Sequence, residues 1–158
     1  SGEMNIKLAE RNDLVSIVNI LDKTTLKLLR KGIEQWSYPW PSSIVEEEIN
    51  KGLVFKMELD NEILGTFMIK PIHRLNSLHI NPNSLYVGRI AIIPEYQGKN
   101  LGASIINFCR AISQEHKKDM YLDCWAGNNK LKSFYMSCDL DYLGDFPEDD
   151  YHISIFQF

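Results

Sequence analysis

The sequence predicts an α/β fold in which helices pack around one mixed β-sheet. Strand-like and helix-like segments follow one another in the order β-α-α-β-β-β-α-β-α-β-β, with no internal repeat and no linker. The length of 158 residues suits one domain on the usual scale of about 100–200 residues. A hydrophobic fraction of 44% and a charged fraction of 24% are typical of a globular protein with one core. These observations exclude a disordered chain, a collagen-like chain and a low-complexity tail.

Seven segments carry strand patterns, either alternating polar and apolar residues or short apolar runs bounded by turn residues. They are residues 5–9, 53–59, 62–70, 85–93, 120–125, 140–146 and 151–158. Asp60-Asn61 predicts a two-residue hairpin turn between the second and third strands, and residues 147–150 predict the turn of the closing pair. The fourth strand is apolar except at Gly88 and Arg89, so we expect both of its faces to be covered.

Four segments carry apolar residues at helical spacing next to a capping signal. Asn12 or Asp13 is expected to cap the first helix, which runs to Gly32. After an aromatic loop, the S-x-x-E pattern at 43–46 predicts a capping box for the second helix, which ends at Gly52. The third helix has its apolar stripe at Leu101, Ile105, Phe108, Cys109 and Ile112, and the fourth, capped by Asn128, at Leu131, Phe134, Tyr135 and Cys138.

Charge and composition exclude several classes of function. Seventeen Lys and Arg stand against twenty-one Asp and Glu, a formal charge of −4, so we expect no nucleic-acid partner, which usually requires a basic excess. The apolar runs are far shorter than the ~20 residues that span a bilayer, so we expect no membrane association. The four histidines are scattered at no metal-ligand spacing, and we predict no metal site.

The cysteines and the N-terminus indicate a cytoplasmic protein. Cys109, Cys124 and Cys138 are odd in number and form no C-x-x-C pair, which predicts reduced core residues. The N-terminus carries no signal peptide. Ser1 and Gly2 resemble a processing remnant of an expression tag, so we expect the domain to span residues 3–158.

The stretch 90–103 carries the strongest functional signal. A buried strand stops at Pro94, and a polar turn containing Gly98 and Lys99 feeds a helix that begins near Leu101. A helix N-terminus reached through small residues presents free backbone N–H groups and a positive dipole end, which favour phosphate. The P-loop pattern and G-x-G-x-x-G are both absent. A phosphate or pyrophosphate cradle and a plain strand–helix connection with two turn glycines both remain open at this point.

Residues 97–102 read Gln-Gly-Lys-Asn-Leu-Gly. This string resembles the pyrophosphate loop [RQ]-x-x-G-x-[GA] of the GNAT superfamily of acyl-CoA-dependent N-acetyltransferases. Asn100 replaces the first glycine of the pattern. Asn is the residue other than glycine that best tolerates left-handed backbone angles, so we expect the loop conformation to survive.

Two further strings resemble the same superfamily. Residues 128–135 read Asn-Asn-Lys-Leu-Lys-Ser-Phe-Tyr, similar to N-x-x-A-x-x-[FY]-Y with Leu131 in place of Ala. The Gly-Phe pair that follows in the family is replaced by Asp139-Leu140, and Asp also tolerates left-handed angles. Residues 32–36, Gly-Ile-Glu-Gln-Trp, resemble a string seen in many bacterial members.

The resemblance implies a fold and a reaction. The fold would be the GNAT fold, a mixed, mostly antiparallel sheet of six to seven strands flanked by four helices in a single domain. The reaction would be transfer of the acetyl group of acetyl-CoA to a primary amine of a small molecule or a protein. In the family the fourth and fifth strands splay apart, and the pantetheine arm of the cofactor pairs with the fourth.

The resemblance also implies site residues. Those that would bind acetyl-CoA are Ile90, Ala91, Ile92, Gln97, Gly98, Lys99, Asn100, Leu101, Gly102, Ala103, Ser104, Asn128, Lys130, Phe134 and Tyr135. Tyr135 matches the tyrosine that protonates the departing thiolate; alternatively it only extends the apolar stripe of its helix. Asp123 and Glu58 are candidate general bases, and a water chain would serve as well because the base varies within the family.

The acceptor site would be built from the loop after the first helix. Trp36, Tyr38 and Trp40 would form an aromatic wall suited to an amine, or would simply pack under the loop. Arg89 would bind an acceptor carboxylate or pair with a buried acid such as Glu58.

Two other interpretations remain open. In the first, the chain would be a non-catalytic acyl-CoA-binding module, and the replaced glycines would reflect relaxed selection on the site. In the second, it would be a Rossmann-type dinucleotide-binding protein, but the absence of G-x-G-x-x-G argues against that interpretation. A homodimer remains an open alternative to a monomer.

Overall fold

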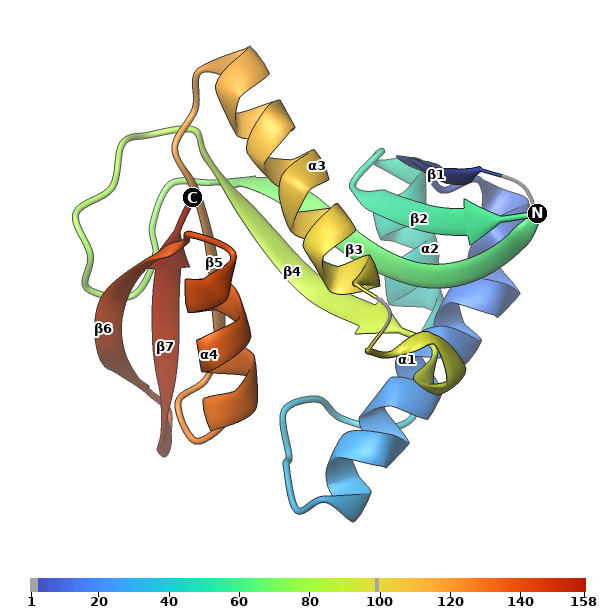
Figure 1. Ribbon diagram of the computed structural model, residues 1–158, viewed down its shortest axis with the longest axis horizontal. Helices are drawn as coiled ribbons and strands as arrows, with labels where there is room; N and C mark the ends of the chain where they lie inside the picture. The colour runs from blue at the N-terminus through green and yellow to red at the C-terminus, as the bar shows by residue number, and fades with distance from the viewer. Residues whose placement is uncertain (1–2, 99) are drawn as a thin grey trace. The chain divides into compact units, whose positions relative to one another are not determined.

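The computed structural model describes residues 3–98 and 100–158 (Figure 1). The predicted tag remnant, Ser1 and Gly2, and the predicted cofactor contact of Lys99 lie outside these residues. Seven strands form one mixed sheet in the order β1-β2-β3-β4-β5-β7-β6, and four α-helices accompany it. The expected α/β class, with six to seven mostly antiparallel strands and four helices, is confirmed.

The chain divides into two compact units, and the boundary passes through β3, β4 and α3. The first unit runs up to Ile69 and includes Arg89–Ile105; the second unit comprises Lys70–Gly88 and Ile106–Phe158. The expectation of a single domain stays a prediction.

The first unit contains two antiparallel pairings and two complete helices. Its elements are β1 (Met4–Leu8), α1 (Leu14–Arg30), α2 (Ser42–Asn50), β2 (Val54–Leu59), most of β3 (Glu62–Ile72), the end of β4 (Ser84–Ile92) and the start of α3 (Leu101–His116). β2 pairs with both β1 and β3. Asp60 and Asn61 have φ of 50° and 64°, the left-handed angles that a two-residue hairpin turn requires. The predicted hairpin is confirmed.

The core of the first unit lies where α1 and α2 pack on β2 and β3 (Figure 1). Ile17 of α1 and Val45 of α2 are almost completely buried, next to Val54 and Met68 of the strands. The apolar stripes predicted from the sequence therefore face the sheet, and their burial is the main source of stability for this unit.

The first helix begins after a predicted N-cap residue, but that residue does not cap the helix with its side chain. Asp13 is the N-cap residue of α1, but its side chain makes no capping hydrogen bond. Its Oδ2 instead accepts from the backbone N–H of Glu10 at 2.7 Å and lies 2.8 Å from Lys56 Nζ. Lys56 is buried at 6% exposure, and a buried ammonium requires such a partner. Asp13 therefore ties the start of α1 to β2.

The second helix begins differently from the prediction. The carbonyl of Pro41 accepts the first helical bonds, from Ile44 N at 3.2 Å and Val45 N at 3.4 Å, so Pro41 is the N-cap. Ser43 is consequently inside the first turn, where its hydroxyl cannot cap the helix. The predicted capping box is wrong, although the helix and its end before Gly52 are confirmed.

The second unit contains one parallel and two antiparallel pairings. Its elements are the end of β3, the start of β4, most of α3, β5 (Met120–Trp125), α4 (Asn129–Ser137), β6 (Asp141–Glu148) and β7 (Tyr151–Gln157). β4 pairs in parallel with β5 through Leu85↔Met120 and Tyr86↔Tyr121. β7 pairs antiparallel with both β5 and β6.

The closing hairpin is longer than predicted. Pro147 and Glu148 belong to β6, where Pro147 pairs with His152 and Glu148 with Tyr151. The predicted four-residue turn is therefore wrong and only Asp149-Asp150 connects the strands. Proline is tolerated because β6 is an edge strand, whose outer N–H groups need no partner in the sheet.

Side chains cover both faces of this part of the sheet. On one face, Tyr121, Ile153 and Ile155 pack with apolar residues of the 73–83 loop and of β6. On the other face lies α4 (Figure 1), whose Tyr135 contacts the Phe156 ring edge-on at a centroid distance of 5.4 Å.

Within the described ranges, no helix is long and apolar enough to cross a membrane.

Candidate active site

The predicted site residues fall in both units. The first unit holds Trp36, Tyr38, Arg89, Ile90, Ala91, Ile92, Gln97, Gly98, Asn100, Leu101, Gly102, Ala103 and Ser104, and the second holds Asp123, Asn128, Lys130, Phe134 and Tyr135.

The predicted phosphate loop of the first unit ends at the N-terminus of α3. Ser104 N donates to Asn100 O at 3.2 Å, which is the first backbone bond of the helix. The N–H groups of residues 100–103 precede that bond and have no partner within the helix. Asn100 has φ of 62° and is exposed, and Gly98 has φ of 83°. The expected left-handed conformation of Asn100 is confirmed, and the turn leaves the N–H groups open to an anion.

Gln97 anchors this loop through both ends of its side-chain amide. Its Nε2 donates to Ile92 O at 3.0 Å, and its Oε1 accepts from Lys27 Nζ at 2.5 Å. The loop is thus fixed to the end of β4 and to α1. Lys27 also brings a positive charge to the loop that the sequence pattern does not reveal.

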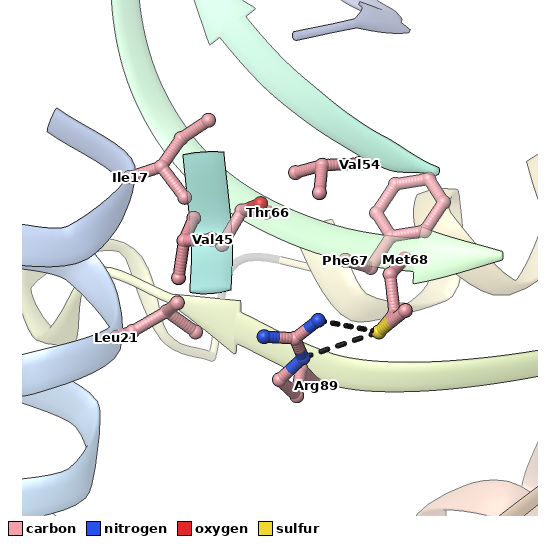
Figure 2. Close-up of a pocket in the computed structure, with 8 residues that line it drawn as sticks. All are labelled: Ile17, Leu21, Val45, Val54, Thr66, Phe67, Met68 and Arg89. Carbon is pink, nitrogen blue, oxygen red and sulfur yellow. Dashed lines mark hydrogen bonds between the residues drawn. The ribbon is translucent and has the colours of Figure 1, made fainter. Parts of the chain in front are cut away.

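Arg89 interrupts β4 with a left-handed backbone, φ 52°, which is rare for a long side chain. Its Nη2 lies 2.5 Å from Glu48 Oε1 and donates to Met68 Sδ at 2.7 Å; the contact with sulfur is drawn in Figure 2. The guanidinium also stacks on Trp40 at 5.2 Å from the ring centroid. Arg89 therefore pairs with an acid, as one of its two interpretations expected. The acid is Glu48, so the suggestion of Glu58 is wrong.

The cavity lined in part by Arg89 belongs to the core of the first unit. Figure 2 shows its lining, which is apolar except for Thr66 and Arg89. It has room for no more than about one water molecule. We therefore assign it no substrate.

The aromatic loop of the first unit is fixed at one end. Trp40 N donates to Asp22 Oδ1 at 2.8 Å, and its indole Nε1 donates to Thr25 Oγ1 at 2.9 Å. Trp36 contacts Trp40 edge-on at a centroid distance of 5.7 Å, whereas Tyr38 is 49% exposed. Trp40 is thus a structural anchor, and the acceptor roles of Trp36 and Tyr38 stay predictions.

In the second unit, Asp123 lies in a polar contact with the neighbouring strand. Its Oδ1 accepts from Tyr86 Oη at 3.1 Å. Burial raises the pKa of Asp123 to about 6, although the Tyr86 hydrogen bond and the positive charge of Lys70 lower it and Glu148 raises it. A carboxyl group with this pKa changes its charge near neutral pH, as a general base requires.

Glu58, the other candidate base, is less suited to the role. Its Oε1 lies 2.7 Å from Lys7 Nζ, and its Oε2 lies 3.4 Å from Lys56 Nζ. The hydrogen bond from Lys7 is the largest influence on the pKa of Glu58, which is lowered in spite of the opposing effect of burial. Both carboxylate oxygens are engaged by cations, so Glu58 is a structural ion-pair partner.

Tyr135 is buried at 4% exposure on α4, between Phe134 and Phe156. Burial is the largest cause that raises the pKa of its phenol above the ordinary value of 10.0, so the group stays protonated. Both interpretations of Tyr135 made from the sequence are compatible with this environment, because the ring packs in the core and the hydroxyl retains its proton.

The start of α4 confirms one predicted interaction. Asn128 Oδ1 accepts from Leu131 N at 3.1 Å, so Asn128 caps the helix as expected. Asp139, which replaces the family glycine after the helix, has φ of 63°. Lys130 is exposed, and Phe134 is half-buried. Their contacts with a cofactor stay predictions.

Comparison with known proteins identifies the family. A family model described as the acetyltransferase (GNAT) family matches residues 22–139. The chain belongs to this family. A relative among curated proteins, the uncharacterized N-acetyltransferase YesJ of Bacillus subtilis (strain 168), is 28% identical over 141 residues, which cover 84% of this chain and 78% of YesJ.

Solved structures share the GNAT fold. A GNAT-family acetyltransferase from Streptococcus agalactiae 2603 matches with a TM-score of 0.81 and 22% identity, over 98% of this chain and 94% of its own. The acetyltransferase yncA from Salmonella typhimurium, solved with its cofactor acetyl-CoA, matches with a TM-score of 0.76 and 14% identity, over 99% and 93% of the two chains.

Three contacts of this GNAT chain were missed by sequence reasoning. Glu48 with Arg89 and Lys27 with Gln97 join residues far apart in the sequence, and no local pattern announces them. The contact between Tyr86 and Asp123 could have been predicted from the sequence. The two residues lie on neighbouring strands and on the same face of the sheet, opposite the face of the buried Leu122.

No cluster of three metal-ligating side chains occurs within the described part of the chain.

Replacing Asn100 with Gly should leave the Kd for CoA unchanged or lower it by up to about threefold, because glycine adopts φ of 62° without strain. Asn100→Ala should raise the Kd by up to about tenfold, because a Cβ disfavours that angle. Isothermal titration calorimetry measures both. Asn83→Gly, at φ of 63° in the second unit, is the matched control and should leave the Kd unchanged. A clear loss of affinity in Asn100→Gly contradicts the argument.

Proposed function

We propose that this chain transfers the acetyl group of acetyl-CoA to a primary amine of a small molecule or of a protein. Family membership supports the acyl-CoA chemistry. The observation that carries the proposal is a pair of groups in the second unit with different protonation at neutral pH. Asp123 has a pKa of about 6 and is ionised, whereas Tyr135 has a raised pKa and stays protonated.

Asp123 is the general base of the proposed reaction. An alkylammonium acceptor has a pKa near 10.4 and must lose a proton before its nitrogen can attack. Asp123 takes that proton, either directly or through water, and the amine nitrogen forms a bond with the thioester carbonyl carbon. We prefer Asp123 to Glu58 because two lysines stabilise the Glu58 carboxylate and weaken it as a base.

Tyr135 is the general acid. When the carbon–sulfur bond breaks, the electron pair remains on the sulfur of CoA, and Tyr135 gives its phenolic proton to that thiolate. The attacking nitrogen loses its second proton to solvent as the amide forms. Solvent then returns a proton to Tyr135 and removes one from Asp123, so the protein is unchanged and one proton is released in each cycle. At reference pKa values, about 10 for a phenol and about 8.5 for a thiol, transfer to the thiolate is slightly uphill, and the raised pKa of Tyr135 adds to that interval.

The first unit supplies the cofactor contacts of the proposal. The open N–H groups of residues 100–103 fit a pyrophosphate, and Gly98 presents no side chain to obstruct it. Ile90, Ala91 and the N–H groups near them are assigned to the pantetheine arm and to polarisation of the thioester carbonyl. Ile92 is assigned to the pantetheine arm as well, because its carbonyl oxygen accepts one hydrogen bond from Gln97 Nε2 and can accept a second.

A thiol-release assay over a panel of primary amines tests the function. The expected result is CoA release that depends on one class of amine and saturates with acetyl-CoA. Binding of CoA without turnover on any amine favours the non-catalytic module instead. Thermal protection by NAD but not by CoA contradicts the GNAT assignment of the site.

The three cysteines are compatible with a reducing, cytoplasmic setting, which we also propose. All three are free, and two of them, Cys109 and Cys124, are buried. Burial raises the pKa of each of these two thiols to about 12, so they carry no thiolate at neutral pH.

A further inference from the structure

Tyr86 and Asp123 form a side-chain pair across two neighbouring strands of the second unit. Tyr86 on β4 is paired in register with Tyr121 on β5, and Asp123 is the next residue on the same face of β5. The Tyr86 hydroxyl donates to Asp123 Oδ1 at 3.1 Å. In the described part of the chain, no donor forms a hydrogen bond with the second carboxylate oxygen, Oδ2.

The ring of Tyr86 is itself held in place. Lys70 Nζ of β3 lies 5.6 Å from the ring centroid, within the range of a cation–π contact. Tyr86 is half-buried, and burial is the largest cause that raises the pKa of its phenol well above the ordinary value, followed by the charge of Asp123. The hydroxyl therefore keeps its proton and acts as a donor to the carboxylate throughout the neutral range.

Other charged and titratable groups act on Asp123 from the surrounding elements. They are Lys70 of β3, Tyr135 of α4, Glu148 of β6, Tyr151 of β7 and the adjacent Cys124 of β5. Tyr86 is the only described residue that donates a hydrogen bond to the Asp123 carboxyl group. Its loss therefore changes the orientation of the carboxyl group as well as its charge environment.

We propose that Tyr86 is a positioning residue of the acetyl-transfer reaction, whose hydroxyl fixes Asp123 Oδ1 and leaves Oδ2 to accept the proton of the amine. This inference rests on the proposed function, in which Asp123 is the base. A carboxylate fixed by one oxygen presents the other in a single orientation, and such orientation lowers the entropic cost of proton transfer.

The hydrogen bond also sets the pH at which Asp123 becomes a base. A donor stabilises the carboxylate form, so its removal raises the pKa of Asp123 above about 6. The acidic limb of the kcat/KM profile, which requires the ionised carboxylate, must then move to higher pH. The expected displacement is about one pH unit, the usual size for a hydrogen bond to a charged group.

Tyr86→Phe tests the proposal, with Tyr151→Phe as the matched control. The control removes a hydroxyl that contacts Glu148 at 3.4 Å and does not contact Asp123. One measurement is the pH profile of kcat/KM with a competent amine. The other follows the ¹³C chemical shift of the Asp123 carboxyl group through a pH titration, which needs no substrate and no activity.

The expected result for Tyr86→Phe is a kcat/KM about tenfold lower at pH 7, an acidic limb about one unit higher and the same displacement in the NMR titration. Tyr151→Phe should shift both curves by less than half as much. An NMR titration of Asp123 that is the same in Tyr86→Phe as in the wild type overturns the inference. A shifted titration with an unshifted rate profile overturns it too, because Asp123 then titrates without serving as the base.

Failure of the proposed function has a different signature. If the wild type releases no thiol with any amine, the proposed transfer reaction is wrong, whatever the titration shows. If the wild type turns over and Asp123→Asn is inactive, but Tyr86→Phe changes neither curve, only the positioning role of Tyr86 is wrong. Thermal melting of each variant verifies that it is folded, which is expected because Phe keeps the ring of Tyr86.

Discussion

Replacing Asp123 with Asn should lower kcat/KM by about 100- to 10,000-fold at pH 7 and at the same time stabilise the folded protein. The rate falls because an amide cannot accept the proton of the amine. The stability rises because the carboxylate of Asp123 is half-buried, and Asn keeps the oxygen that accepts from Tyr86 without carrying a charge.

The size of the stability change depends on pH. The pKa of Asp123 is about 6 in the folded protein, against an ordinary value of 3.8. The ionised group is therefore less favourable in the folded than in the unfolded state. Its destabilising effect is absent below pH 3.8, grows between pH 3.8 and about 6 and is complete above that. The shift corresponds to roughly 1–3 kcal/mol of unfolding free energy.

Urea unfolding at pH 4, 6 and 8 measures this effect. Asp123→Asn should match the wild type at pH 4 and exceed its stability at pH 8. Asp145→Asn is the matched control with the opposite sign. Hydrogen bonds from Ser154 and Tyr142 lower the pKa of Asp145, so its carboxylate is stabilising and its loss should destabilise the protein at pH 8. Full activity in Asp123→Asn, or lower stability at pH 8, contradicts the assignment of Asp123.

Replacing Tyr135 with Phe should lower kcat by about 100-fold and change the Kd for CoA by less than about threefold. The variant keeps the ring that packs on Phe156 and loses only the hydroxyl that gives a proton to the leaving thiolate. Because the interaction is made in the transition state, kcat and kcat/KM should fall together. Steady-state kinetics and calorimetric titration with CoA measure the two quantities.

Two controls separate acid catalysis from packing in Tyr135→Phe. Tyr142 also contacts Phe156, at a centroid distance of 5.5 Å, so Tyr142→Phe should leave kcat unchanged. A thioester whose thiol has a lower pKa needs less protonation and should recover part of the rate lost in Tyr135→Phe. If kcat is unchanged in Tyr135→Phe, the tyrosine has only its packing role.

Features set by neighbouring residues could be predicted from the sequence. β5 runs from Met120 to Trp125 as expected, and the Asp60-Asn61 turn and the Asn128 cap form as predicted. The turn and the cap each depend on residues at most three positions apart. The Ser43 capping box failed for a local reason as well, because the carbonyl of Pro41 starts the helix two residues earlier.

Features set by packing between distant segments could not be predicted in the same way. The charge of Arg89 within an apolar strand indicated either an acceptor carboxylate or a buried acid as its partner, and the choice of Glu48 depends on where α2 lies against β4. The chemistry of Asp123 likewise became apparent only with Tyr86 beside it. Sequence patterns thus located the strand and helix ends that carry candidate groups, while the partners that tune those groups come from the tertiary structure.

The left-handed backbone at Asn100 and Asp139 has a consequence for how distant relatives are recognised. Most of the described residues with positive φ that are not glycine are Asn or Asp. At these positions Asn and Asp thus adopt the positive φ for which the family pattern uses glycine. A search that demands glycine at these two positions would discard sequences that keep the same backbone. A pattern that requires a positive φ, and therefore accepts Gly, Asn or Asp, would retain those sequences. It would also distinguish relatives in which only the residue type has changed from relatives that have lost the loop conformation.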